Sequence, residues 1–187
     1  MRKVILESIM SLEGYIEGAN GEIDWIPFDQ EAAAYLNSFA DEIDIVFYGR
    51  VSYDMYGSYS PQSDIDDEKS FYSKINSKKK YVFSKQLDRV EGGATLINSD
   101  MIEEVERIKN EAGRNIWLFG GANLITSFVN ADLIDEYRIS MAPLILGSGK
   151  PLFQQISNRV PLKLLRQSTS ASGVISMHYE RRVVNSE

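Results

Sequence analysis

The stretch Asn115-Ile-Trp-Leu-Phe-Gly-Gly-Ala-Asn-Leu-Ile-Thr-Ser-Phe-Val129 decides how this chain folds. Residues 116–119 form a short apolar run, which is typical of a buried strand. Gly120 and Gly121 end that strand, and a helix over residues 123–129 is expected to begin directly after them. The first N–H groups of such a helix are unpaired and lie at the positive end of its dipole, so this turn can receive a phosphate group. Because glycine pairs mark turns of every kind, a tight turn without a ligand is the competing interpretation.

The length and composition of the chain indicate a single globular domain over residues 1–187. A chain of this length can bury a substantial core, and 43% hydrophobic with 25% charged residues is ordinary for such a domain. With 20 Lys and Arg against 27 Asp and Glu, the net charge is -7. Nucleic acids and anionic membranes both favour a basic surface, so neither is expected as a partner.

The content of cysteine and histidine excludes several kinds of site. The chain has no cysteine and a single histidine, His178. A disulfide framework, a thiol nucleophile and a thiolate metal site are therefore excluded, and no metal is expected. The N-terminal segment reaches Glu7 after three apolar residues, too soon for a signal peptide, and no apolar run approaches membrane-spanning length. We expect a cytoplasmic location.

The rest of the chain alternates between strand-like and helix-like segments. Further strands are predicted at residues 4–9, 43–48, 81–84 and 94–97, and a closing antiparallel pair at 162–168 and 174–182. Helices are predicted after Asp29, at 51–56 and from Asp100 to Ala112, with a polar surface loop at 57–67. This alternation indicates an α/β layered domain with a mostly parallel sheet and antiparallel C-terminal strands.

Three predicted strands end in small or cationic residues. In α/β sheets ligands bind at the carboxyl ends of the strands, and Arg or Lys there can bind phosphate oxygens. We expect a dinucleotide cradle in which the glycine pair lies near a pyrophosphate and the cations near an adenosine ribose phosphate. The sequence contains neither G-x-G-x-x-G nor a P-loop, so this is not the common dinucleotide fingerprint. The candidate cofactor-binding residues are Gly49, Arg50, Ser52, Ser84, Lys85, Gly120, Gly121, Ala122, Asn123 and Leu124.

The order and spacing of six motifs resemble the dihydrofolate-reductase-like superfamily. The similarity is greatest to the branch that contains the C-terminal reductase domain of the bifunctional riboflavin-biosynthesis deaminase-reductase, and it covers residues 4–181. No single motif is very specific, and the match rests on their order. The motifs are residues 11–16 (SLEGYI), 49–53 (GRVSY), 81–84 (YVFS), 119–122 (FGGA), 133–136 (LIDE) and 146–153 (LGSGKPLF).

This resemblance implies a fold, a cofactor and an assembly. The fold is a three-layer α/β/α domain with a mixed, mostly parallel eight-stranded sheet. The cofactor is NADPH, with its 2′-phosphate near Arg50, Ser52 and Ser84, and a cis peptide bond is implied at Gly120-Gly121. A homodimer is implied as well, and the apolar run at residues 144–146 suits an interface.

The substrate side is less readable from the sequence. Dihydrofolate reductases carry a carboxylate at the start of the first helix, and the segment Trp25-Ile-Pro-Phe-Asp29 places Asp29 near that position. A partly buried carboxylate with a raised pKa can hold or protonate a pterin or pyrimidine ring, so Asp29 is the catalytic candidate. The alternative is that Asp29 only caps the helix. Ser11 and Trp25 are the substrate-binding candidates, and a lone His178 in a closing strand is more often structural.

These inferences predict an NADPH-dependent oxidoreductase that acts on a small heterocycle. The nearest known step is the 5-amino-6-(5-phosphoribosylamino)uracil reductase step of riboflavin biosynthesis. The deaminase half of that bifunctional enzyme needs a zinc site, which a chain without cysteine does not supply. Dihydrofolate reductase is an alternative, disfavoured by Ala122 and Ile125 at positions where that enzyme has glycine and tyrosine. A non-catalytic NADP-binding module is the second alternative.

Overall fold

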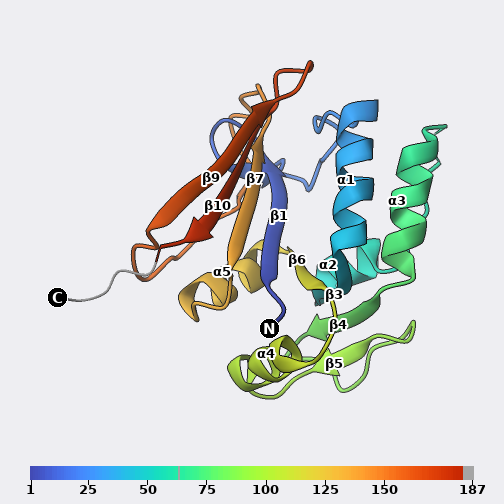
Figure 1. Cartoon of the computed structure of the whole chain (residues 1–187), viewed down its shortest axis with the longest axis vertical. Helices are drawn as coiled ribbons and strands as arrows, with labels where there is room; N and C mark the ends of the chain where they lie inside the picture. Colours follow the sequence, from blue (N-terminus) through green and yellow to red (C-terminus); the bar gives the residue numbers. More distant parts are fainter. Residues whose placement is uncertain (63, 183–187) are drawn as a thin grey trace.

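A computed structural model describes residues 1–62 and 64–182 of the chain. Its main feature is an eight-stranded sheet with the order β5-β4-β3-β6-β1-β7-β10-β9 (Figure 1). Strands β2 and β8 form a separate two-stranded sheet. The helices are α1 (Gln30–Glu42), α2 (Arg50–Tyr56), α3 (Asp66–Asn76), α4 (Met101–Asn110) and α5 (Ala122–Asn130). The strands are β1 (Val4–Met10), β2 (Tyr15–Glu17), β3 (Ile43–Gly49), β4 (Lys79–Phe83), β5 (Thr95–Ile97), β6 (Asn115–Gly120), β7 (Glu136–Met141), β8 (Lys150–Pro151), β9 (Leu162–Thr169) and β10 (Ile175–Arg181).

Helices cover both faces of the large sheet, as the predicted three-layer α/β/α fold requires. One core cluster joins the sheet to α4 and α5, and a second joins it to α1, α2 and α3. Figure 1 shows α1 and α3 side by side on one face. The strands from β5 to β7 pair in parallel, whereas β10 is antiparallel to both β7 and β9. The mostly parallel sheet with antiparallel C-terminal strands is therefore confirmed.

The alternation of side chains along β1 positions one charged residue. Val4 and Leu6 pack in the core that contains α4 and α5, whereas Ile5 packs in the core that contains α1. Because successive side chains of a strand point to opposite faces, Glu7 and Ile9 follow Ile5 to the α1 face.

The sequence predicts neither α3 and β7 nor the two short strands β2 and β8. The acidic segment predicted as a loop over residues 57–67 enters α3 at Asp66. Helix α3 forms because three acidic residues in its first turn favour the dipole, and because Phe71 and Ile75, four positions apart, are buried on one side. Strand β7 pairs with β1 on one side and with β10 on the other. This pairing with strands distant in the sequence stabilises β7, and the local alternating pattern of residues 136–141 does not reveal it.

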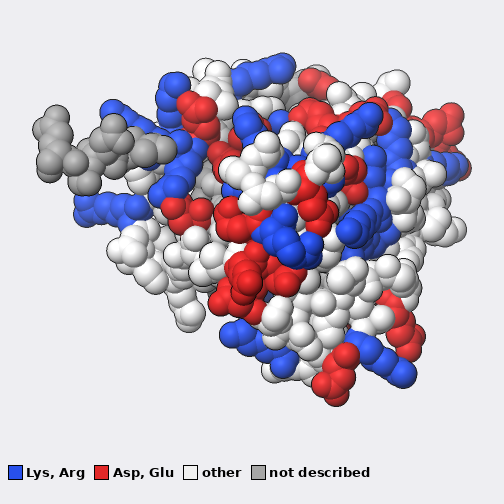
Figure 2. Space-filling model, turned by 60° about the horizontal axis from the view of Figure 1, so that its bottom comes forward, with Lys and Arg blue, Asp and Glu red and all other residues white. Residues whose placement is uncertain are grey.

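The amino ends of the strands carry mixed charge. Arg2 pairs with Asp44 at 2.6 Å, and Lys3 pairs with Glu136 at 2.6 Å. Figure 2, which brings the lower side of Figure 1 forward, shows acidic and basic side chains interleaved on this face. Within residues 1–62 and 64–182, no helix is both long and apolar enough to cross a membrane.

Candidate functional site

The first of two cavities lies at the carboxyl ends of β3, β4 and β6. It has a volume of about 620 Å³, within the range of small-molecule and cofactor sites, and is named here the glycine groove. The structure brings nine of the ten predicted cofactor-binding residues into its lining: Gly49, Arg50, Ser52, Ser84, Lys85, Gly121, Ala122, Asn123 and Leu124. The tenth, Gly120, directly precedes them as the last residue of β6.

Close backbone approach explains the glycines at this point. Gly120 has φ +99°, and a Cβ added to it would lie 2.7 Å from Ile125 Cδ1. A Cβ on Gly121 would lie 3.2 Å from Ser52 Oγ, so the turn after β6 sits tightly against α2. The peptide bond between Gly120 and Gly121 is cis, which confirms the expectation drawn from the family resemblance.

The glycine groove has the donors and the charge that a phosphorylated cofactor needs. Helix α5 begins here, and its N-cap, Gly121, has no side chain to pair with the first N–H groups of the helix. Arg50 lies at the rim with its side chain 44% exposed and an ion pair to Asp54 at 3.2 Å, an exposed contact that phosphate can displace. Lys85 adds a second cation and Lys150, paired with Glu17, a third. These residues fit the pyrophosphate and 2′-phosphate of NADPH.

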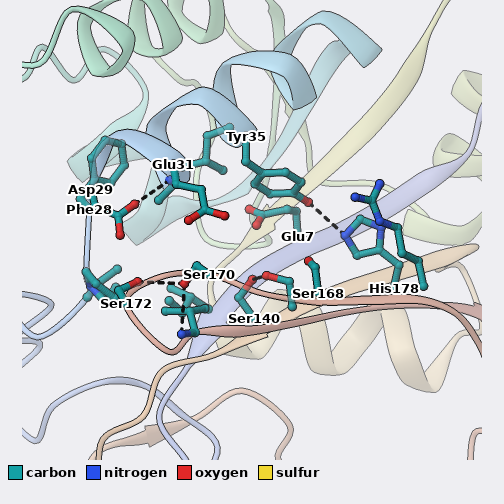
Figure 3. A pocket seen from close by; sticks show the side chains of 18 residues that line it. Glu7, Phe28, Asp29, Glu31, Tyr35, Ser140, Ser168, Ser170, Ser172 and His178 are labelled. Carbon is teal, nitrogen blue, oxygen red and sulfur yellow. Dashed lines mark hydrogen bonds between the residues drawn. The ribbon is translucent and has the colours of Figure 1, made fainter.

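The second cavity lies on the α1 face, between α1 and the strands β1, β7, β10 and β9. It has a volume of about 340 Å³ and is named here the α1 cavity. Figure 3 shows its polar lining: acids from β1 and from the start of α1, and hydroxyls from the strands below and from the hairpin between β9 and β10. The hydroxyls belong to Ser140, Ser168, Ser170, Ser172 and Ser176.

Glu7 is the most strongly perturbed carboxyl group of the α1 cavity. Protein atoms surround it except where it meets the cavity, and this burial raises the pKa of Glu7 to about 7. The charge of Arg138 opposes this rise but does not cancel it. Its guanidinium already binds Glu42, at 2.8 and 3.2 Å, and Glu136, at 3.1 Å, so two carboxylates neutralise it before Glu7 does.

Tyr35 and His178 lie beside Glu7 in the same cavity. The Tyr35 hydroxyl and His178 Nε2 are 3.5 Å apart, and burial raises the pKa of Tyr35. Burial, with the nearby charges of Arg138 and Arg166, lowers the pKa of His178. His178 is therefore neutral at physiological pH, and it borders a cavity rather than only packing the closing strand.

Asp29 lines the α1 cavity, but its environment differs from the prediction. Its carboxylate accepts a hydrogen bond from the Ala32 N–H at 2.8 Å as the N-cap of α1, and another from Ser172. These bonds lower the pKa of Asp29, so the expectation of a raised pKa is wrong. The structure shows the N-cap of the alternative interpretation.

Ser11 and Trp25 lie apart from both cavities as far as the described lining residues show. Ser11 is fully buried, and its hydroxyl accepts a hydrogen bond from the Tyr15 N–H at 3.2 Å. Trp25 Nε1 donates to the Glu22 carbonyl at 3.0 Å, within the loop before α1. Their role in substrate binding stays a prediction.

The sequence contains one signal for the α1 cavity. Glu7 is a charged residue within the apolar run of residues 4–9, and a charge in a central strand requires a partner or a cavity. The serines of β7, β9 and β10 carried no comparable signal, because hydroxyls are common on strands. In residues 1–62 and 64–182, no group of three or more His, Asp or Glu side chains has the arrangement of a metal site.

A curated relative and several solved structures are similar to this chain. It is 43% identical over 179 residues to the uncharacterized protein YyaP of Bacillus subtilis, covering 95% of this chain and 94% of YyaP. A putative riboflavin biosynthesis protein from Shewanella superposes with a TM-score of 0.79 at 21% identity, covering 98% of this chain and all of that one.

Two further structures share the fold at lower identity. One is a diaminohydroxyphosphoribosylaminopyrimidine deaminase/5-amino-6-(5-phosphoribosylamino)uracil reductase from Thermotoga maritima (TM-score 0.71, 15% identity, 97% of this chain and 57% of that one). The other is a dihydrofolate reductase from Enterococcus faecalis complexed with NADP(H) (TM-score 0.66, 13% identity, 97% of each chain).

The family assignment rests on the sequence itself. Residues 2–176 match the RibD C-terminal domain, which covers most of the chain. This agrees with the glycine groove and with the dihydrofolate-reductase-like sheet order around it. The chain therefore belongs to the RibD C-terminal domain family, a family of reductase domains.

Proposed function

We propose that this protein is an NADPH-dependent reductase of a small heterocycle. One observation supports this above the others: two cavities are built on adjacent strands of one sheet. Strand β6 leads into the glycine groove, and its neighbour β1 contributes Glu7 and Ile9 to the α1 cavity. A reductase needs a cofactor site and a substrate site side by side, because hydride passes directly between the two molecules.

The first candidate substrate is the pyrimidine of the 5-amino-6-(5-phosphoribosylamino)uracil reductase step. The Thermotoga structure with this name shares the fold. A pterin is the second candidate, because the charge of the α1 cavity favours it. Three carboxyl groups, Glu7, Asp29 and Glu31, face the cavity against the single guanidinium of Arg166, which is a poor setting for a phosphate tail.

Titration with NADPH and NADH, followed by nicotinamide fluorescence, tests the cofactor site. Arg50→Ala is expected to weaken NADPH binding about 10-fold, because a charge-assisted contact to the 2′-phosphate is lost, and to leave NADH binding nearly unchanged. Arg89→Ala is the matched control, since Arg89 is an exposed cation outside the glycine groove. If wild-type protein binds neither nucleotide, the proposed function is wrong.

Turnover separates a reductase from a binding module. NADPH oxidation with 5-amino-6-(5-phosphoribosylamino)uracil or with a 7,8-dihydropterin supports a reductase and distinguishes the two candidates. NADPH binding without oxidation across such a panel supports the non-catalytic NADP-binding module.

A homodimer is part of this proposal. Strand β9 is the edge of the large sheet, all eight of its residues are exposed, and three of them are leucines: Leu162, Leu164 and Leu165. An exposed apolar edge strand favours pairing with a second copy. A dimer mass in light scattering that Leu164→Lys reduces to a monomer mass supports this arrangement, and a monomer mass for wild-type protein contradicts it.

A further inference from the structure

We propose that Glu7 is the catalytic acid of the α1 cavity, which binds the N–H edge of the substrate heterocycle and delivers a proton to the nitrogen of the C=N bond that is reduced. This inference rests on the proposed function, and it assigns to a β1 residue the role that the sequence suggested for Asp29.

The hydrogen bonds of the three cavity carboxyl groups single out Glu7. Asp29 is occupied by the Ala32 N–H and by Ser172, and Glu31 accepts a hydrogen bond from the Ala171 N–H at 3.2 Å. In the described part of the chain, no donor pairs with the Glu7 carboxyl group. Asp29 and Glu31 thus link α1 to the hairpin between β9 and β10. Glu7 retains its full hydrogen-bonding capacity for a ligand.

The position of Glu7 suits that role. It lies on the strand next to β6, which ends at the glycine groove, and its backbone is held in the sheet and by the Trp117 Nε1–H, which donates to its carbonyl at 3.2 Å. In Figure 3 its carboxyl end points into the space between Tyr35 above and Ser140 below. A rigid strand fixes the acid more precisely than the loop that ends at Asp29.

The surrounding charges keep Glu7 able to give up and regain a proton near neutral pH. The other titratable groups facing the cavity are Asp29 at the N-cap of α1, Tyr35 and Glu31 from α1, His178 from β10 and Arg166 from β9, with Arg138 of β7 behind. Arg138 is shared by two carboxylates and His178 is neutral, so no full counter-charge holds Glu7 ionised. The raised pKa agrees with this geometry and gives both protonation states appreciable populations.

The proton balance of the step is simple. Reduction of a C=N bond of the substrate requires a hydride on its carbon, which a nicotinamide cofactor would supply when bound. As the C=N π bond breaks, the Glu7 O–H bond breaks and an N–H bond forms on the substrate, leaving Glu7 as a carboxylate. That carboxylate regains its proton from water entering the α1 cavity.

Binding of 2,4-diaminopyrimidine, a weakly basic heterocycle whose N–H edge matches a carboxylate, tests the assignment by calorimetry. Glu7→Gln is expected to raise its Kd about 10-fold, because a charge-assisted pair is lost. Glu31→Gln removes the same charge from the same cavity and is expected to raise the Kd by less than about 3-fold. Equal weakening by both variants, or no weakening by Glu7→Gln, overturns the proposal.

A second readout does not depend on the ligand. In protein labelled with carbon-13 at glutamate carboxyl groups, one resonance is expected to titrate near pH 7 and to be missing from Glu7→Gln. Absence of such a titration in wild-type protein overturns the proposal. Glu7→Gln is expected to bind NADPH as wild-type protein does. If wild-type protein does not bind NADPH, the proposed function itself fails, and that outcome is distinct from a failure of the Glu7 assignment.

Discussion

The glycine groove and the α1 cavity differ in how the chain builds them. The glycine groove is made by short contiguous segments, residues 49–52, 84–85 and 121–124, each of which directly follows a strand. The α1 cavity is made mainly by single side chains at alternate positions of four strands and of the hairpin between β9 and β10, together with the first turns of α1 and residues 26–29 before it. Contiguous segments leave a motif in the sequence, whereas alternate positions leave isolated residues.

The two regions also respond differently to substitution. The glycine groove depends on backbone shape, because Gly120 and Gly121 leave little room for a side chain. The α1 cavity depends on the protonation and hydrogen bonding of its carboxyl groups. Variants in the two regions should therefore differ in their dependence on pH.

The largest expected effect concerns Glu7. Its pKa rises from 4.5 to about 7 on folding, so the folded state binds this proton more tightly than the unfolded state, and wild-type stability falls as the pH rises through that interval. The shift corresponds to about 3 kcal/mol. The unfolding free energy of Glu7→Gln minus that of wild type should therefore rise by about 3 kcal/mol as the pH increases from about 4 to about 8. Urea unfolding of both proteins measures this difference. Parallel pH profiles of the two proteins would contradict the burial of an uncompensated acid.

The next effect concerns Gly120. An alanine there would have to hold φ +99° with its Cβ 2.7 Å from Ile125, so Gly120→Ala should lower the unfolding free energy by about 2 kcal/mol at any pH. Gly93→Ala is the matched control: it has φ +78° but open space around it, and should cost about 1 kcal/mol. NADPH binding should weaken only in Gly120→Ala. Equal costs in both variants would show that close approach at the glycine groove is unimportant.

The sequence predicted the glycine groove well and the α1 cavity poorly, for physical reasons. Gly120 and Gly121 are favoured because the backbone after β6 approaches Ile125 and Ser52 closely, a local requirement that residue type reveals. The sequence allows two roles for Asp29, helix N-cap and catalytic acid. Its hydrogen bonds to the Ala32 N–H and to Ser172 are visible only in the structure, and they favour the N-cap. Glu7 acquires its raised pKa from burial among elements distant in the sequence, and Arg138, 131 positions away, does not offset it because Glu42 and Glu136 already bind its guanidinium.

The same division applies to the fold. Strongly apolar strands such as β3 and β6, and the capped helices α1 and α4, could be located from local patterns. Helix α3 and strand β7 could not, because their amphipathic patterns are short and their burial is set by neighbours distant in the sequence.

The smallest expected effect concerns Asp29. Asp29→Ala should destabilise the protein by about 1 kcal/mol at neutral pH through loss of the N-cap of α1. Because the pKa of Asp29 is lowered on folding, this contribution is present at neutral pH and lost as the pH falls below about 4, opposite in sign to Glu7. Urea unfolding across that range measures both. A loss of 2,4-diaminopyrimidine binding as large as that of Glu7→Gln would restore Asp29 as the catalytic acid.

The most direct test of two neighbouring sites is a backbone amide NMR titration, first with NADPH and then with 2,4-diaminopyrimidine. NADPH is expected to shift residues 49–52, 84–85 and 120–124, and the diaminopyrimidine a separate set around Glu7, Tyr35, Ser140 and His178. Two separate sets of shifted residues support a cofactor groove beside a substrate cavity. Shifts from both ligands at the same residues, or no shifts from NADPH at the glycine groove, would contradict it.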